Sequence, residues 1–210
     1  MDTLDCIHSR RSIRKFMDIP VEFEKLGNIL EAGRYAPSAG NLQDWNFLII
    51  TDKEKREAVA KACFEQYWIS HAPVIVVVGV TPSKTERYYG ESGEMFSICN
   101  GAAAVQNMLL TAHAEGLASC WVGAFEKAML HRVLNISDDV IVTAVLPVGY
   151  ADEQVPVPPR KILENLTFVD AWGNKVKDLA AYMEWYGEHV QKAAKRTKEF
   201  VKDFVRRLQQ

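Results

Sequence analysis

The segment from Ala72 to Val80 is the feature of this chain that most limits its possible folds. It is apolar on consecutive residues, whereas a half-exposed strand alternates apolar and polar side chains. Continuous apolar strands are covered on both faces. The run is far shorter than the roughly 20 apolar residues that cross a bilayer. The sequence therefore predicts a buried strand over 73–80, and it predicts no transmembrane helix.

A long central helix is predicted from Phe96 to Gly116. Small residues are frequent in it, namely Gly101, Ala102, Ala103, Ala104 and Ala112. Small side chains let another backbone approach closely, so we expect this helix at the centre of the fold. Further strands are expected at 45–51, 118–122 and 140–148, and further helices at 3–9, 21–35, 53–63 and 126–134. This mixture predicts layers of helices and strands.

The C-terminal residues carry the longest helical pattern, from about Val176 to Leu208. Its apolar stripe recurs at helical spacing and consists of Leu179, Met183, Tyr186, Val190, Ala193, Val201, Phe204 and Leu208. Such a helix is roughly 50 Å long, and its apolar face needs a covering surface. Residues 175–210 hold nine Lys/Arg against five Asp/Glu. Without a basic motif or an aromatic platform, this charge favours a solvated helix face over nucleic-acid binding.

Composition indicates a soluble globular protein, with 48% apolar residues, 25% charged residues and a net charge of −2. The N-terminus carries Asp2 and Asp5 and does not have the pattern of a signal peptide, so we expect a cytoplasmic location. The four cysteines are widely spaced, without a CxxC pair or a neighbouring histidine at ligand spacing: Cys6, Cys63, Cys99 and Cys120. We interpret them as reduced thiols and expect no metal site.

Three arginines and a serine, Arg10, Arg11, Ser12 and Arg14, stand where the first helix is expected to end. Guanidinium groups match phosphate oxygens with two hydrogen bonds each, so the cluster could bind a phosphorylated ligand. Arginines also favour the negative end of a helix dipole, and local chemistry alone leaves both interpretations open.

Three other segments could bind a ligand or could be ordinary structure. The loop that begins at Pro37 is rich in hydrogen-bonding groups, among them those of Ser38 and Asn41. It either binds a ligand or is an ordinary turn. Gly123 ends a buried strand and could leave backbone N–H groups free. Arg160 and Lys161 follow a Pro-rich connection and form either an anion site or a solvated pair.

In their order along the chain, these segments resemble the nitroreductase family over nearly all of residues 3–165. The shared pattern is Arg-Arg-Ser-(apolar)-Arg, a Pro-Ser-x-x-Asn-x-Gln loop, a small-residue helix, Gly-Leu-x-Ser-Cys-Trp-(apolar)-Gly, and Pro-Val-Gly-Tyr before an Arg-Lys pair. The resemblance implies an α+β fold with a mixed β-sheet between helix layers, and the helical pattern adds a long C-terminal helix. We expect an FMN-binding domain at 1–168 and a helical extension at 169–210, which has no counterpart in the family pattern and which the resemblance does not explain.

The resemblance also assigns roles at the phosphate of FMN. Arg10, Ser12, Arg160 and Lys161 would hold the phosphate, and Arg11 would contribute mainly through its backbone. Asp44 departs from the family pattern, because a proline usually follows Gln43. The replacement adds a charge near the loop and leaves the rigidity of the loop open.

The flavin ring receives further residues in the same way. Arg14 would lie near N1 and O2, and the segment of Val122 and Gly123 would offer an amide to N5. Gln66 would contact the pyrimidine edge. The loop residues that would reach the flavin bound chiefly by the partner subunit are Pro37, Ser38 and Asn41.

The resemblance implies a homodimer with two FMN molecules at its interface, which transfers hydride from NAD(P)H to a nitroaromatic, a quinone or an activated alkene with ping-pong kinetics. No side chain would act as a nucleophile, since the flavin carries the hydride. The five histidines are scattered: His8, His71, His113, His131 and His189. Two alternatives are a reductive dehalogenase or flavin-destroying enzyme of the same superfamily, and a non-enzymatic interaction protein with a basic helical tail.

Overall fold

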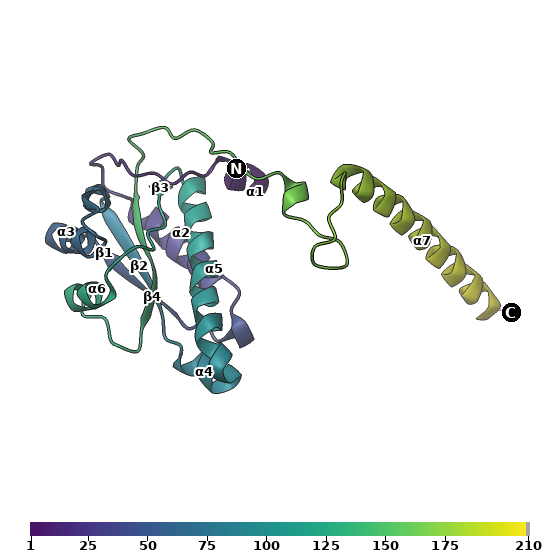
Figure 1. The fold of residues 1–210 in the computed structure, drawn as a ribbon, viewed down its shortest axis with the longest axis horizontal. Helices are drawn as coiled ribbons and strands as arrows, with labels where there is room; N and C mark the ends of the chain where they lie inside the picture. Colours follow the sequence, from purple (N-terminus) through teal and green to yellow (C-terminus); the bar gives the residue numbers. More distant parts are fainter. Residues whose placement is uncertain (209–210) are drawn as a thin grey trace. The chain divides into compact units, whose positions relative to one another are not determined.

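The computed structural model describes the backbone of residues 1–208 and the side chains of residues 1–192 and 195. The chain divides into two compact units, Met1–Val157 and Pro158–Gln210. Figure 1 labels the elements of both units. The predicted domain boundary at residue 168 stays a prediction.

The N-terminal unit contains a four-stranded sheet in the order β1-β2-β4-β3. The strands are β1 (Trp45–Ile50), β2 (Val74–Val80), β3 (Ala118–Ser119) and β4 (Ile141–Gly149). These strands all pair antiparallel. Within the described residues, the predicted mixed character is present only as one isolated parallel bridge between Ser12 and Ser119. The α+β class is as predicted.

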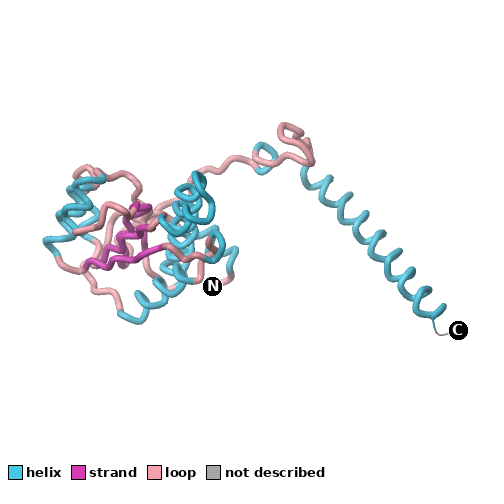
Figure 2. Tube along the Cα trace, turned by 90° about the horizontal axis from the view of Figure 1, so that it is seen from below, coloured by secondary structure: helices cyan, strands magenta, loops and turns pink. Residues whose placement is uncertain are grey.

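The buried strand β2 explains the continuous apolar run, because its two sets of alternating side chains enter two different cores. Val76 and Val78 pack in one core with helices α2 (Phe23–Arg34) and α5 (Gly93–Ala114). Ile75 and Val77 pack in the other with α3 (Lys53–Ala62) and α6 (Lys127–Leu134). Successive side chains of a strand point to opposite faces, so a sheet with two covered faces needs apolar residues at every position. Figures 1 and 2 show the strands between these two helix layers.

The small residues of α5 let this helix lie directly against the sheet. A Cβ atom at Gly101 would stand 2.8 Å from Cγ1 of Val80 and 2.9 Å from Cγ2 of Thr143. Ala104 is fully buried beside them. The predicted role of α5 as the central helix is therefore confirmed.

Two elements differ from the sequence-based expectation. The helix α4 (Ser83–Tyr89) was not predicted, because its sequence is mostly polar and only Thr85 in it is buried. The strand expected over 118–122 is only two residues long, and its register resumes at an isolated bridge between Val122 and Val145.

The N-terminal unit begins with α1 (Thr3–Ser9) and includes three short 3₁₀ helices: η1 (Ala39–Asn41), η2 (Tyr67–His71) and η3 (Gly90–Ser92). The C-terminal unit contains η4 (Leu163–Asn165) and α7 (Leu179–Leu208). Of the predicted apolar stripe, Met183, Tyr186 and Val190 are exposed. The side chains of Ala193, Val201, Phe204 and Leu208 lie outside the described residues. Over residues 1–208, no helix combines the length and apolar character of a membrane span.

Candidate functional site

The arginine cluster lies on an extended segment that is attached to the edge of β3. Arg10 ends α1, where its N–H bonds to the carbonyl oxygen of Cys6 at 3.0 Å. Ser12 then bridges to Ser119, and the N–H of Ile13 donates to the carbonyl oxygen of Ser119 at 3.1 Å. This pairing brings together the first and third motifs of the sequence.

The two arginines at the start of this segment have different surroundings. Nη1 of Arg11 donates to the carbonyl oxygens of His8 at 2.7 Å and Arg10 at 2.6 Å. Arg11 thus satisfies carbonyl groups at the end of α1, as the helix-dipole interpretation expects. Burial is the largest influence on the pKa of both His113, where it is lowered, and Cys120, where it is raised, and the charge of Arg10 acts to lower both.

A pocket of about 450 Å³ opens beside Arg10 and Arg11. His113, Ser119 and Glu153 also line it. Partial burial, followed by the charges of Arg10 and Arg11, holds the pKa of His113 below its usual value. Nε2 of His113 lies 2.7 Å from Oγ of Ser9. The two guanidinium groups outnumber the one carboxylate, that of Glu153, so the lining of this pocket carries a net positive charge. Another depression, of about 530 Å³, lies along α6, and none of the motif residues lines it.

Arg14 is held through its backbone. Its N–H donates to Oε1 of Glu153 at 2.5 Å, and the N–H of Lys15 donates to the same oxygen at 3.0 Å. The Arg14 guanidinium lies over the ring of Trp68, 5.8 Å from its centroid. Trp68 belongs to η2, which begins after Gln66. The contact therefore joins Arg14 to the segment of Gln66, whose Nε2 donates to the carbonyl oxygen of Cys63 at 2.9 Å.

The segment after β3 places a buried thiol beside Ser12 and Arg14. Burial raises the pKa of Cys120, while the charge of Arg14 and a hydrogen bond with Ser12 act in the opposite direction. Val122 uses both backbone groups in the sheet, with bonds of 3.0 and 2.9 Å to Val145. Because the Val122 N–H is already paired, a free amide for a ligand falls to exposed Gly123 rather than to Val122.

The 37–43 loop adopts an unusual backbone conformation. Gly40, Asn41 and Gln43 have φ values of 56°, 57° and 49°, in the left-handed region. Oγ of Ser38 accepts from the N–H of Gln43 at 3.1 Å, and Oδ1 of Asn41 accepts from Nε2 of Gln43 at 3.1 Å. Pro37 is exposed at the start of the loop. Two of the three predicted loop residues, Ser38 and Asn41, thus shape the loop through their own side chains.

The loop and the arginine cluster lie near opposite ends of α5. The N–H of Ala39 bonds to Oδ1 of Asn100, whereas Ser9 contacts His113. Asn100 and His113 are separated by about 20 Å along the helix axis at 1.5 Å per residue. In Figure 1, α4 stands at one end of α5, and α1 and β3 stand at the other.

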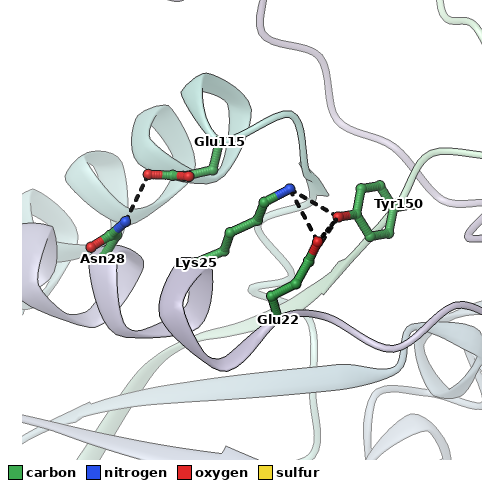
Figure 3. Close-up of polar contacts among 5 residues, drawn as sticks. All are labelled: Glu22, Lys25, Asn28, Glu115 and Tyr150. Atoms are coloured by element: carbon green, nitrogen blue, oxygen red, sulfur yellow. Dashed lines mark hydrogen bonds and ion pairs between the residues drawn. The ribbon is translucent and has the colours of Figure 1, made fainter.

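Tyr150 from the Pro-Val-Gly-Tyr motif anchors α2 (Figure 3). Its hydroxyl donates to the carboxylate of Glu22 at 2.7 Å and accepts from Nζ of Lys25 at 2.9 Å. The hydrogen bond with Tyr150 is the main cause that lowers the pKa of Glu22 and raises that of Lys25. The carbonyl oxygen of Tyr150 also accepts from the N–H of Met17. Sequence reasoning used Tyr150 only as part of a motif and missed this anchoring role.

Nearby, a second contact joins α2 to the end of α5. Nδ2 of Asn28 donates to Oε1 of Glu115 at 2.9 Å, as Figure 3 shows. Together with the Tyr150 cluster, this contact fixes α2 against the end of α5 and the end of β4.

Arg160 and Lys161 belong to the C-terminal unit, where both are exposed. Their predicted role at a phosphate stays a prediction.

An antiparallel sheet between two helix layers, with separate polar clusters toward the two ends of a central helix, defines an α+β protein with a candidate binding site beside β3. The nitroreductase family model matches residues 7–70 and 64–150. The chain therefore belongs to the nitroreductase family, as its motifs predicted, and is an oxidoreductase.

Three similar proteins illustrate this relationship. A nitrobenzene nitroreductase from Ectopseudomonas oleovorans is 29% identical, over 79% of this chain and 96% of its own length. An NADPH-flavin oxidoreductase from Vibrio harveyi is 27% identical, over 76% of this chain and 70% of its own. The solved structure of an FMN-dependent nitroreductase from Clostridium difficile is 27% identical, with a TM-score of 0.66, over 75% of this chain and 92% of its own.

Proposed function

We propose that this protein is an FMN-dependent oxidoreductase that transfers hydride from NAD(P)H to a small electron-poor acceptor, such as a nitroaromatic, a quinone or an activated alkene. The pairing of Ile13 with Ser119 carries the proposal, because it sets the arginine segment beside the strand that leads to Gly123. A phosphate grip and a free amide then lie on adjoining segments. The similarity to an FMN-dependent nitroreductase and an NADPH-flavin oxidoreductase supports the choice of cofactor and donor.

The residues of the pocket fit the phosphate end of FMN. Arg10 and Arg11 line the pocket, and Ser12 supplies a hydroxyl on the same segment. Arg11 already donates to carbonyl groups of α1, so Arg10 and Ser12 are the main phosphate ligands in this proposal. The roles of Arg160 and Lys161 at the phosphate rest on the family resemblance alone. Guanidinium and hydroxyl donors are the groups that phosphate oxygens accept from.

At the ring, the chain supplies charge and orientation. FMN, when bound, supplies the acceptance and donation of hydride. With FMN bound, Arg14 would place a cation near N1 and O2, Gly123 would offer its backbone N–H near N5, and Gln66 would contact the pyrimidine edge. Donor and acceptor would bind in turn, and ping-pong kinetics would follow.

A homodimer completes the proposed site. The helix positions that contact the 37–43 loop and the end of α1, Asn100 and His113, lie about 20 Å apart along α5. In the proposal each flavin therefore takes the arginine cluster from one subunit and the loop chiefly from the other, as the family resemblance implies. Large apolar side chains are exposed on α1 and α5, namely Leu4, Ile7, Met95 and Ile98. Exposed apolar surface of this kind favours a protein partner, and a second copy with two-fold symmetry is the commonest one. The FMN-binding domain at 1–168, the extension at 169–210 and the cytoplasmic location are parts of the same proposal.

The experiment is to purify the protein, record its visible spectrum and identify the compound that denaturation releases. We expect a yellow protein that releases FMN. A colourless protein that takes up no added FMN would contradict the proposal.

A further inference from the structure

We infer that Asp44 is a positioning residue that sets the 37–43 loop through the side chain of Asn100. The inference rests on the proposed function, which places this loop against the flavin. Asp44 stands where the family pattern has a proline, and its side chain is 6% exposed.

Asp44 is the centre of a buried hydrogen-bond cluster between the loop, α4 and α5. Its Oδ2 accepts from the hydroxyls of Thr85, at 2.7 Å, and Ser97. Its Oδ1 accepts from Nδ2 of Asn100 at 2.7 Å. Thr85 and Ser97 are fully buried, and Asn100 is 4% exposed. Three donors from two helices therefore converge on one carboxylate.

The chemistry of the cluster fixes the orientation of the Asn100 amide. An ionised carboxylate can only accept hydrogen bonds, so Asn100 must turn its NH₂ group toward Asp44. Its carbonyl oxygen then faces the loop, where it accepts from the N–H of Ala39 at 2.9 Å. The backbone N–H of Ala39 can only donate, so both neighbours of Asn100 require the same orientation.

The loop needs such support because its backbone is unfavourable by itself. Asn41 and Gln43 adopt left-handed φ values, which persist only where surrounding contacts determine them. On the other side of the loop, a Cβ atom at Gly40 would stand 2.8 Å from the hydroxyl oxygen of Tyr89. The loop is thus held between Tyr89 of α4 and Asn100 of α5.

The test exchanges donor and acceptor in the relay, that is, the two consecutive hydrogen bonds from Asp44 to Asn100 and from Asn100 to Ala39. Asn100→Asp sets two carboxylates against each other and should release the loop. The double variant Asp44→Asn with Asn100→Asp restores one donor facing one acceptor, and leaves a carboxylate oxygen to receive the Ala39 N–H. Thr85→Val is the matched control, because it removes one bond to Asp44 without touching the relay. Asn100→Ala removes the acceptor for Ala39 without adding a charge, and serves if Asn100→Asp does not fold.

Two readouts separate this inference from the proposed function. Hydrogen exchange of the peptide covering 36–43 reports on the loop with or without flavin. Visible circular dichroism of the FMN-loaded protein reports on the surroundings of the ring. We expect exchange in the loop to rise roughly tenfold in Asn100→Ala, the effect of losing about one hydrogen bond. Exchange should also rise in Asn100→Asp, because two carboxylates that face each other repel and push the side chain at position 100 away from Ala39. The double variant and Thr85→Val should exchange like wild type.

The dichroism should change in the same variants and recover in the double variant. Wild-type exchange in both single Asn100 variants, no recovery in the double variant, or equal effects in Thr85→Val would overturn the positioning role. If the wild-type protein binds no FMN while the variants show the expected differences in exchange, the proposed function is contradicted and the positioning role of Asp44 is not.

Discussion

The backbone N–H of Ile13 donates to the carbonyl oxygen of Ser119 over 3.1 Å, and this bond joins two motifs that lie more than a hundred residues apart in the sequence. It fixes Arg10, Ser12 and Arg14 on an extended segment beside β3. Arg10 and Arg11 therefore line a pocket shared with the end of α5, and Arg11 in addition donates to the carbonyl groups at the end of α1.

The proposed phosphate site predicts that the neighbouring residues Arg10 and Arg11 contribute differently to FMN affinity. Arg10→Ala should weaken FMN binding by about 1.5–3 kcal/mol, the range for hydrogen bonds to charged groups. Arg160→Ala should do the same. Arg11→Ala is the matched control and should have a smaller effect, because its guanidinium serves the carbonyl groups of His8 and Arg10. Titration of the apoprotein with FMN measures all three. Wild-type affinity in Arg10→Ala would show that the phosphate binds elsewhere.

Arg14 should tune the reduction potential of the bound flavin. A fixed cation near N1 and O2 favours the more negatively charged redox state, so Arg14→Gln should lower the potential by roughly 20–40 mV, since about 30 mV corresponds to 1.4 kcal/mol for two electrons. Arg14→Lys keeps the charge and should largely preserve the potential. A spectroscopic redox titration compares the three loaded proteins. An unchanged potential in Arg14→Gln would mean that another group balances the charge.

The Tyr150 cluster should contribute stability between about pH 4 and about pH 10, where Glu22 and Lys25 are both ionised. Tyr150→Phe removes its bonds to these two residues and should lower the melting temperature by a few degrees at neutral pH. The pKa of Glu22 is lowered by folding, so its contribution is lost as the pH falls through that pKa. The pKa of Lys25 is raised, so its contribution is lost as the pH rises through that pKa.

Thermal unfolding of wild type and Tyr150→Phe across this range measures the effect. The difference in melting temperature between wild type and Tyr150→Phe should become smaller at both the acidic and the basic end of the pH range. A gap that is independent of pH would contradict the role of the two ionised groups.

Two glycines should respond in opposite ways to alanine. Gly40 has a φ of 56° and lies against the hydroxyl of Tyr89, so Gly40→Ala should destabilise the protein by about 1–2 kcal/mol. Gly27 lies within α2, and a Cβ atom added there would meet nothing within 4 Å, so Gly27→Ala should stabilise the protein by about 0.5–1 kcal/mol. Denaturant unfolding gives both values. Equal effects would show that backbone conformation does not limit the loop.

The sequence predicted the core and most of the secondary structure because their signal is local. The consecutive valines of β2 require two covered faces, and the small residues of α5 require close packing. The buried network of Asp44 could not be predicted, because it depends on Thr85, Ser97 and Asn100 meeting in space. Tyr150 was missed for the same reason, since its partners on α2 lie far away in the sequence. The helix α4 has only one buried residue and so shows no apolar periodicity.

The C-terminal helix should contribute to the dimer. Met183, Tyr186 and Val190 are exposed apolar residues of α7, and such a surface favours burial against a partner. Deleting residues 176–210 should therefore lower dimer stability or solubility. Sedimentation and thermal unfolding of the truncated protein measure this. If the truncated protein stays dimeric with an unchanged melting temperature, the predicted contribution of the helix to the dimer is contradicted.

An anaerobic titration of the purified protein with NADH or NADPH tests the central claim most directly. The nicotinamide donor should bleach the visible flavin band at one equivalent per bound FMN, and a nitroaromatic or quinone added afterwards, in the absence of donor, should restore it. Both half-reactions would then proceed separately, as ping-pong transfer requires. A bound flavin that neither donor bleaches, or whose colour no acceptor restores, would contradict the proposed function.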